Sequence, residues 1–280
     1  DYPAEIRGVV KDYAATETTK TVSSIWTEGD AIGVTTAAGI SKISYIMTDD
    51  RNVKYAYNAE KDVFQVVSKE GEDHTIYFKG PYTMSMTAYA PYTGERGTLA
   101  GVIQASTTSE KQVGTARATI DFLYAEGGGS QTNPRVEFQF FHKMSQLVLA
   151  FKAGGGLELD DISYTLKNII LDGSFDTSAG SVASGKTTGN INMSLAKGKE
   201  MNSSVIVFPQ KLASTLLLEL AMGGKTYAQP IGNGIDLISG NTYIFDVTIA
   251  PQSMTVSPAK IEDWIWGENS DHYVIAGESE

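Results

Sequence analysis

No cysteine occurs among the 280 residues of this chain, and histidine occurs only three times, as His74, His142 and His272. Without cysteine the chain has no disulfide framework, no thiolate metal site and no thiol nucleophile. Zinc sites and nucleophile–histidine–acid triads need histidines at defined spacing or beside a reactive hydroxyl, and these three lie far apart. The sequence therefore predicts neither an enzyme nor a bound metal or cofactor.

Positive charge is also scarce, since 22 Lys and Arg face 33 Asp and Glu and the formal net charge is −11. Nucleic acids and anionic membranes both attract basic surfaces, so neither is an expected partner. No apolar run approaches the roughly 18 residues of a membrane-spanning helix. The sequence begins Asp1-Tyr2-Pro3, which we interpret as the start of a processed chain with a targeting segment upstream.

The sequence is rich in two-residue alternation, the pattern of half-buried β-strands. Short alternating runs bounded by Gly, Asn, Asp, Ser or Pro occur at residues 53–57, 74–78, 84–88, 205–208, 215–222 and 243–249. Gly223-Gly224 separates two apolar runs and predicts a two-residue hairpin turn. Helical candidates are limited to a weak one near residues 259–265. The fold class is therefore predicted to be all-β.

The glycine-rich stretch AEGGGSQTNP, residues 125–134, predicts a flexible linker. We expect it to separate an N-terminal β-sandwich of residues 1–128 from a C-terminal β-sandwich of residues 134–280. Each part has the size of one such domain. Residues 177–194 are small and polar, and they predict an exposed loop in the second domain.

The best-patterned stretch is PRVEFQFFHKMSQLVLAFKA, residues 134–153. One face of a strand is formed by Val136, Phe138, Phe140 and His142. The apolar residues then move to odd positions at Leu147, Leu149 and Phe151. This change of phase requires a turn or bulge between about residues 143 and 146. His142 is in phase with the buried face, which favours a core residue over a catalyst.

Paired carboxylates at residues 49–50, 160–161 and 262–263 are the candidates for glycoside hydrolysis. Adjacent residues on a strand point to opposite faces, so turn or strand-end positions explain these pairs better. Calcium bound by loop carboxylates stays open, although the full D-x-[DN]-x-[DN]-G loop is absent. Trp26, Trp264 and Trp266 can line a sugar-binding surface, but packing in the core explains them more simply.

Several segments together resemble the fimbrillin-like proteins, the subunits of type V pili: IWTEGDAIGV (25–34), MTAYAPY (86–92), DFLYA (121–125), VEFQFFHKMSQLVL (136–149) and YIFDVTIA…MTVSPAKIEDW (243–264). The resemblance spans nearly the whole chain. It implies two transthyretin-like (Greek-key) β-sandwich domains in tandem. It also implies export as a lipoprotein precursor to the cell outer membrane and assembly into a surface fimbria that supports cell adhesion. In this family the segment around His142 opens the second sandwich, which makes His142 structural.

The resemblance implies assembly by strand exchange, in which a protease removes a leading strand and a terminal segment of another subunit fills the exposed groove. The matching leading strand here is EIRGVVK, with Glu5, Ile6, Gly8, Val9 and Val10 as its main residues. The cut is expected between Lys20 and Thr21, with Arg7 and Lys11 as fallback sites. The family typically has arginine at the cut, so Lys20 indicates a lysine-specific or trypsin-like protease.

The candidate donor strand consists of Tyr243, Phe245, Val247 and Ile249, which alternate in phase. The same segment also fits the closing strands of the second domain. Expected partners are other fimbrial subunits, the processing protease and a host or bacterial surface receptor. The alternative function is a surface lipoprotein or pilus-tip adhesin that binds glycans or host ligands. The sequence does not separate stalk, tip and anchor subunits.

Overall fold

The computed structural model describes residues 2–10, 26–37, 50–78, 82–198 and 201–264. Almost all regular structure in these ranges is β-strand, which confirms the all-β prediction. Two short 3-10 helices, η2 (Ser109–Lys111) and η3 (Gly114–Thr119), interrupt the strands. No helix in the described ranges is long and apolar enough to cross a membrane.

The chain forms two compact units. Unit 1 comprises Asp1–Ile103, Phe122–Lys143 and Phe175–Ser181, and unit 2 comprises Gln104–Asp121, Met144–Ser174 and Val182–Glu280. This division differs from the single boundary expected near residue 130. Residues 104–121 precede the expected boundary but belong to unit 2. Residues 135–142 follow it but belong to unit 1.

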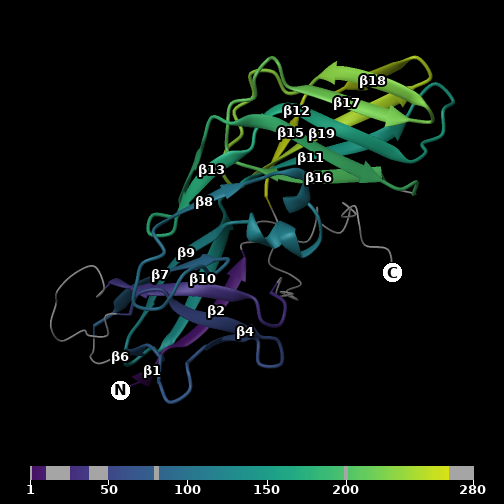
Figure 1. The fold of residues 1–280 in the computed structure, drawn as a ribbon. Helices are drawn as coiled ribbons and strands as arrows, with labels where there is room; N and C mark the ends of the chain where they lie inside the picture. The colour runs from purple at the N-terminus through teal and green to yellow at the C-terminus, as the bar shows by residue number, and fades with distance from the viewer. Residues whose placement is uncertain (1, 11–25, 38–49, 79–81, 199–200, 265–280) are drawn as a thin grey trace. The chain divides into compact units, whose positions relative to one another are not determined.

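In unit 1, seven strands close into a barrel in the order β10-β2-β5-β4-β3-β7-β9 (Figure 1). Their bounds are β2 (Glu5–Val10), β3 (Ala31–Thr36), β4 (Val53–Asn58), β5 (Val63–Val66), β7 (Met84–Ala90), β9 (Leu123–Gly129) and β10 (Arg135–His142). A separate pair joins β1 (Tyr2–Pro3) to β6 (Tyr77–Phe78). Of the run predicted at residues 74–78, only β6 is a strand.

The core of unit 1 follows from the alternation seen in the sequence. Along β10 exposed and buried residues alternate without a break, with Val136, Phe138 and Phe140 fully buried and His142 4% exposed. The prediction that His142 lies in phase with the buried face is confirmed. The next strand starts at Ser145, so the change of phase also falls where the sequence placed it.

The glycines of AEGGGSQTNP are part of β9 rather than of a linker. Gly129 pairs with Met84, and Gly127 pairs with Met86. A Cβ at Gly127 would lie 3.0 Å from the ring of Phe138, and one at Gly129 would lie 2.5 Å from the ring of Phe78. The linker prediction was therefore wrong, because these glycines make room for large core side chains.

Unit 2 is a sandwich of two sheets (Figure 1). One sheet has the order β16-β11-β19-β20 and consists of β11 (Ser145–Ala153), β16 (Met201–Val207), β19 (Asn241–Ala250) and β20 (Ser253–Val256), with β21 (Lys260–Asp263) also on β19. The other has the order β15-β12-β17-β18 and consists of β12 (Ile162–Ile170), β15 (Thr188–Leu195), β17 (Leu217–Met222) and β18 (Lys225–Pro230). Buried side chains from both sheets share one core.

The edge of β16 is covered by side chains from the segment that contains η2 and η3. Gln112 is fully buried, and its Nε2 donates to the Ile206 carbonyl over 2.9 Å. The Ile206 N–H donates in return to Gln112 Oε1 over 2.8 Å. Arg117 Nη1 donates to the Ser204 carbonyl over 2.8 Å. These bonds occupy backbone groups that would otherwise form an open sheet edge.

Several local predictions can be compared directly with the structure. Gly223 and Gly224 have φ of 56° and 75° and join β17 to β18, which confirms the hairpin. Residues 259–265 are not helical, since Lys260–Asp263 form β21. Residues 177–194 are not one loop, because β14 (Ser181–Ser184) and most of β15 lie there. A third sheet has the order β14-β13-β8, with β8 (Val102–Ser106) and β13 (Asp172–Asp176).

Candidate functional site: the leading strand and its groove

Strand β2, the expected leading strand, is held unequally by its two neighbours. Against β10 it runs parallel over six residue pairs, from Arg135 opposite Glu5 to Phe140 opposite Val10. Against β5 it runs antiparallel and shares one pair, Ile6 opposite Phe64. The barrel is therefore closed by a full ladder on one side of β2 and by a minimal one on the other.

Alternate residues of β2 face the core, as the pleat of a strand requires. Ile6 is 1% exposed, and both Ala4 and Val10 contribute to the same apolar cluster. On the outer face Glu5 is exposed and Val9 is 42% exposed. The side chains that point into the core from this position are therefore those of Ala4, Ile6, Gly8 and Val10, and their sizes have to fit the core.

Gly8 lies between two aromatic rings that leave no space for a side chain. A Cβ at Gly8 would lie 2.8 Å from the ring of Phe140 and 2.9 Å from the ring of Phe64. Trp26 packs edge-on against both rings, with centroid distances of 5.2 Å to Phe140 and 5.1 Å to Phe64. Its Nε1 donates to the Gly8 carbonyl over 3.0 Å. We call Trp26, Phe64 and Phe140 the aromatic clamp.

A hollow of about 570 Å³ adjoins β2 on its weakly paired side. Its lining includes Ala4, which precedes β2, Ile6 of β2, and Val63, Phe64 and Val66 of β5. The hollow lies where the two strands share a single pair, so space remains beside the small side chain of Ala4.

The predicted processing residues are only partly within the described ranges. Lys20, Thr21 and Lys11 lie outside them. Arg7 is within β2, opposite Glu137 of β10, and is half-buried. A peptide bond in the middle of a paired strand is poorly accessible to a protease, because cleavage needs an extended and unpaired segment.

The four candidate donor residues lie in β19. Tyr243, Phe245, Val247 and Ile249 are each at most 1% exposed and belong to the core of unit 2. Strand β19 is paired in parallel with β11 over eight residues and antiparallel with β20 and β21 on its other side. The structure therefore places them inside this chain's own sandwich, as the closing-strand interpretation expects.

Other candidates for chemistry are occupied by structural contacts. Asp50 is 3% exposed and lies 3.2 Å from Arg96, while Asp49 is outside the described ranges. Glu262 and Asp263 are adjacent residues of β21, and the amide of Asp161 donates to Asp160 Oδ1 over 2.9 Å. Trp26 and Trp264 are buried, and Trp266 is not described. Among the described residues no group of three His, Cys, Asp or Glu could hold a metal ion.

Residues 180–187, GSVASGKT, fit the letters of the phosphate-binding loop G-x-x-x-x-G-K-[ST]. That loop connects a strand to a helix, whereas here β14 is followed by β15. The amide of Thr187 donates to Asp172 Oδ1 over 2.8 Å, and its hydroxyl donates to Oδ2 over 3.1 Å. The Asp172 carboxylate already accepts hydrogen bonds from these donors and would repel a phosphate. The sequence match therefore does not indicate a nucleotide-binding site.

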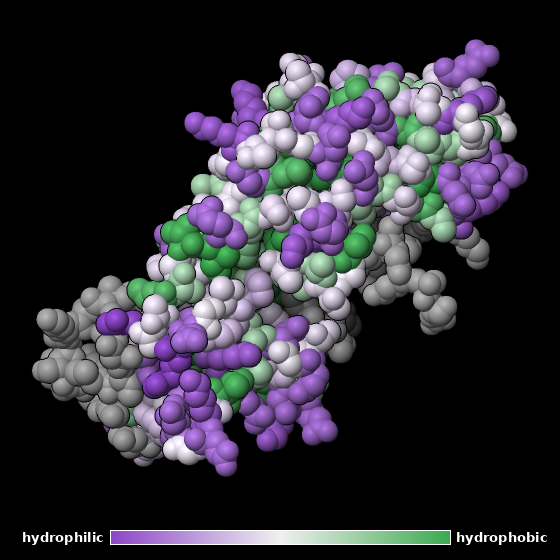
Figure 2. Space-filling view, viewed as in Figure 1, coloured by the Kyte–Doolittle hydropathy of each residue, from purple (hydrophilic) through white to green (hydrophobic). Residues whose placement is uncertain are grey.

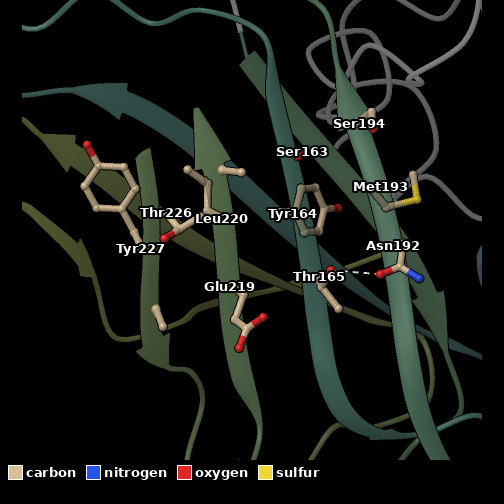
Figure 3. Close-up of a pocket in the computed structure, with 12 residues that line it drawn as sticks. Ser163, Tyr164, Thr165, Asn192, Met193, Ser194, Glu219, Leu220, Thr226 and Tyr227 are labelled. Atoms are coloured by element: carbon tan, nitrogen blue, oxygen red, sulfur yellow. Dashed lines mark hydrogen bonds between the residues drawn. The ribbon is translucent and has the colours of Figure 1, made fainter. Parts of the chain in front are cut away.

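A second hollow, of about 520 Å³, lies on the polar face of the sheet β15-β12-β17-β18 (Figure 3). Thr165 donates to Asn192 across this face over 2.8 Å, and Lys167 pairs with Glu219 over 2.7 Å. Tyr164 is buried, and its hydroxyl is hydrogen-bonded to Ser203 on the core side. Tyr227 lies opposite buried Leu220 and packs partly against the core. Neither tyrosine ring offers a platform on which a sugar could stack, so this hollow does not favour the glycan-binding alternative.

The part of the chain's surface visible in Figure 2 is mostly hydrophilic, with hydrophobic residues in small groups. The described structure thus defines an all-β protein of two units, one of which is completed by a strand that is strongly paired on one side only.

The model of the family described as fimbrillin-like matches residues 15–264. The chain belongs to this family, as its sequence segments indicated. It is 27% identical over 265 residues, which are 89% of this chain and 82% of that protein, to the "Putative fimbrium subunit Fim1C" of Bacteroides uniformis.

Two solved structures are similar to this chain. A "putative cell adhesion protein" from Bacteroides ovatus is 32% identical, with a TM-score of 0.83 over 95% of this chain and 99% of that chain. A second protein so described, from Bacteroides uniformis, shares the fold at 23% identity, with a TM-score of 0.70 over 94% of this chain and 98% of that chain.

Proposed function

We propose that this protein is a structural, non-catalytic subunit of a surface fimbria that assembles by protease-triggered exchange of β2. The observation that carries the proposal is the unequal pairing of β2, with six residue pairs to β10 and one to β5. Family membership and the related fimbrium subunit support the structural role.

Cleavage between Lys20 and Thr21 would convert β2 from part of the chain into a bound peptide. The peptide's departure would leave the inner rings of Phe138 and Phe140 exposed, together with the backbone groups of residues 135–140. An open edge of this kind pairs readily with an extended segment of another chain. The partners of this step are a lysine-specific or trypsin-like protease and another fimbrial subunit.

The cut site is tested by limited trypsin digestion followed by mass spectrometry and size-exclusion chromatography. The first stable product should begin at Thr21, and higher oligomers should then accumulate. Lys20→Gln should block both events. Lys11→Gln and Arg7→Gln serve as matched controls and should leave both unchanged. First cleavage at Arg7 or Lys11 in the parent chain would contradict the assigned site.

A fimbrial subunit acts outside the cell, so we place the assembled protein at the surface of the outer membrane, delivered as a lipoprotein precursor. Fractionation of the native host followed by protease shaving of intact cells tests this location. Loss of the protein from intact cells on shaving is expected. Full protection until the cells are lysed would contradict a surface position.

A further inference from the structure

We propose that unit 2 forms a covalent cross-link on its own, an ester between the hydroxyl of Thr242 and the side-chain carboxamide of Gln146. The bond would join β19 to β11, which lie side by side in parallel over eight residue pairs. It concerns unit 2 alone and does not depend on the exchange of β2 proposed above. Its basis is the placement of three side chains in one row across the sheet.

Gln146 and Thr242 are directly opposite each other in the ladder between β11 and β19. Opposite residues on neighbouring strands place their side chains on the same face of the sheet. Thr242 Oγ1 donates a hydrogen bond to Gln146 Oε1 over 3.0 Å. The hydroxyl oxygen is therefore held beside the carboxamide that it would attack, and fixed proximity of this kind is a large part of the barrier in such reactions.

Both side chains are withdrawn from water. Thr242 is fully buried, and Gln146 is 9% exposed. In the described ranges this contact is the only hydrogen bond that either side chain makes. A dry site keeps water from competing as a nucleophile and from hydrolysing a finished ester. The small exposed fraction of Gln146 gives released ammonia a path to solvent.

A carboxylate lies on the other side of Thr242. Glu262 of β21 is directly opposite Thr242, so the row across the sheet runs Gln146, Thr242, Glu262. The Cβ atoms of opposite residues are about 5 Å apart, a distance that a glutamate side chain can span. Glu262 is therefore placed to take the hydroxyl proton as a general base.

The reaction balances in atoms and protons without an oxidant. Glu262 takes the proton of the Thr242 hydroxyl, and Oγ1 attacks Cδ of Gln146 to give a tetrahedral intermediate. Glu262 then gives the proton to the amide nitrogen, the C–N bond breaks and ammonia leaves. The ester remains and the carboxylate is regenerated. The fixed neighbours supply a high effective concentration, and dilution of ammonia into solvent, where it is protonated, drives the reaction forward.

A second row with the same kinds of side chain lies on the other sheet of unit 2 in different surroundings. Thr165 Oγ1 donates to Asn192 Oδ1 over 2.8 Å, and Glu219 lies opposite Thr165. Asn192 is exposed, and Glu219 is paired with Lys167 at 2.7 Å. Because water reaches this carboxamide and an ammonium holds the carboxylate, we expect no ester in this row. The protein thus contains its own control.

The intact mass of the purified protein tests the inference. One ester lowers the mass by that of one ammonia, and the tryptic peptides of residues 144–152 and 226–260 should be recovered joined to each other. Dilute alkali hydrolyses esters much faster than amides, so brief treatment should separate the two peptides. A protein with its full sequence mass and both peptides free would overturn the inference and leave the proposed function standing.

Variants test the assigned residues. Thr242→Val, which lacks the hydroxyl, should have its full mass, whereas the matched control Thr165→Val should still lose one ammonia. Thr242→Ser keeps the hydroxyl and should keep the cross-link, which a purely structural role of the threonine would not require. Glu262→Gln should slow formation of the bond in freshly synthesised protein by about a hundredfold or more. A cross-link that persists in Thr242→Val, or that forms at the parent's rate in Glu262→Gln, would contradict the assignment.

Discussion

Trp26 Nε1 donates a hydrogen bond to the carbonyl oxygen of Gly8 over 3.0 Å, which ties a residue beyond the expected cut site to the strand before it. After cleavage between Lys20 and Thr21, this bond would join two separate chains. It is therefore one of the contacts that hold the cleaved leading strand in place. Its loss should hasten exchange without preventing it.

Trp26→Phe removes the hydrogen bond and part of the ring packing. We expect the uncleaved protein to lose roughly 1–3 kcal/mol of unfolding free energy, from the lost bond and the smaller ring. After cleavage, the peptide of residues 1–20 should dissociate faster than from the parent. Urea unfolding and chromatography of the released peptide measure the two effects. Unchanged release would show that the clamp does not limit exchange.

Gly8→Ala places a methyl group against Phe64 and Phe140. Because the rings have to shift, we expect destabilisation of the uncleaved protein by about 1–3 kcal/mol. Val9→Ala, on the exposed outer face of the same strand, is the control and should change stability by about 0.5 kcal/mol or less. Thermal unfolding of the parent, Gly8→Ala and Val9→Ala proteins measures these differences in stability. Equal stability of all three would mean that the rings move freely.

Gln112→Ala removes the side chain that bonds both backbone groups of Ile206. The Ile206 N–H and carbonyl would then be buried without partners, at a cost of about 1–3 kcal/mol each at most. Gln104→Ala, the same change at an exposed position, should have little effect. If the edge of β16 becomes available for pairing, the Gln112 variant should also associate at high concentration. Light scattering and urea unfolding provide the measurements.

Burial raises the pKa of Tyr89 to about 12, although the hydrogen bond that the Thr93 amide donates to the Tyr89 hydroxyl opposes the shift. In the unfolded chain a tyrosine has a pKa near 10. The unfolded state thus binds fewer protons between pH 10 and 12, and stability falls as the pH rises through this window. Tyr89→Phe should flatten the decline when urea midpoints are compared at pH 8, 10 and 11.5. An equal slope in parent and variant would contradict this assignment.

Much of the fold could be predicted from the sequence, because buried and exposed residues alternate along a half-buried β-strand. In β10 the alternation of Val136, Phe138 and Phe140 carried through to complete burial, and the turn at Gly223-Gly224 followed from its need for positive φ. Such features depend on neighbours in the sequence. They need no knowledge of what lies opposite.

The misjudged segments depended on distant partners. Gly127 and Gly129 have the composition of a linker, and the rings of Phe138 and Phe78 that lie against them explain why glycine is required in a paired strand. Gly8 is the same case. The rings of residues 64 and 140 lie against Gly8, and Trp26 packs against both rings. In the sequence, the only local sign of this close packing was a glycine inside an alternating strand. The division into units differs from the predicted boundary for a related reason, because residues 104–121 pack against unit 2 by single side chains such as Gln112 and not by an alternating pattern.

The central claim is that β2 leaves its groove when subunits join, and the composition of the polymer tests it most directly. The protein, cleaved after Lys20, is separated into monomer and polymer, and each fraction is unfolded and analysed by mass spectrometry for residues 1–20. We predict about one such peptide per subunit in the monomer and almost none in the polymer. A polymer that retains one peptide per subunit would contradict strand exchange, since the groove would still be filled by its own leading strand.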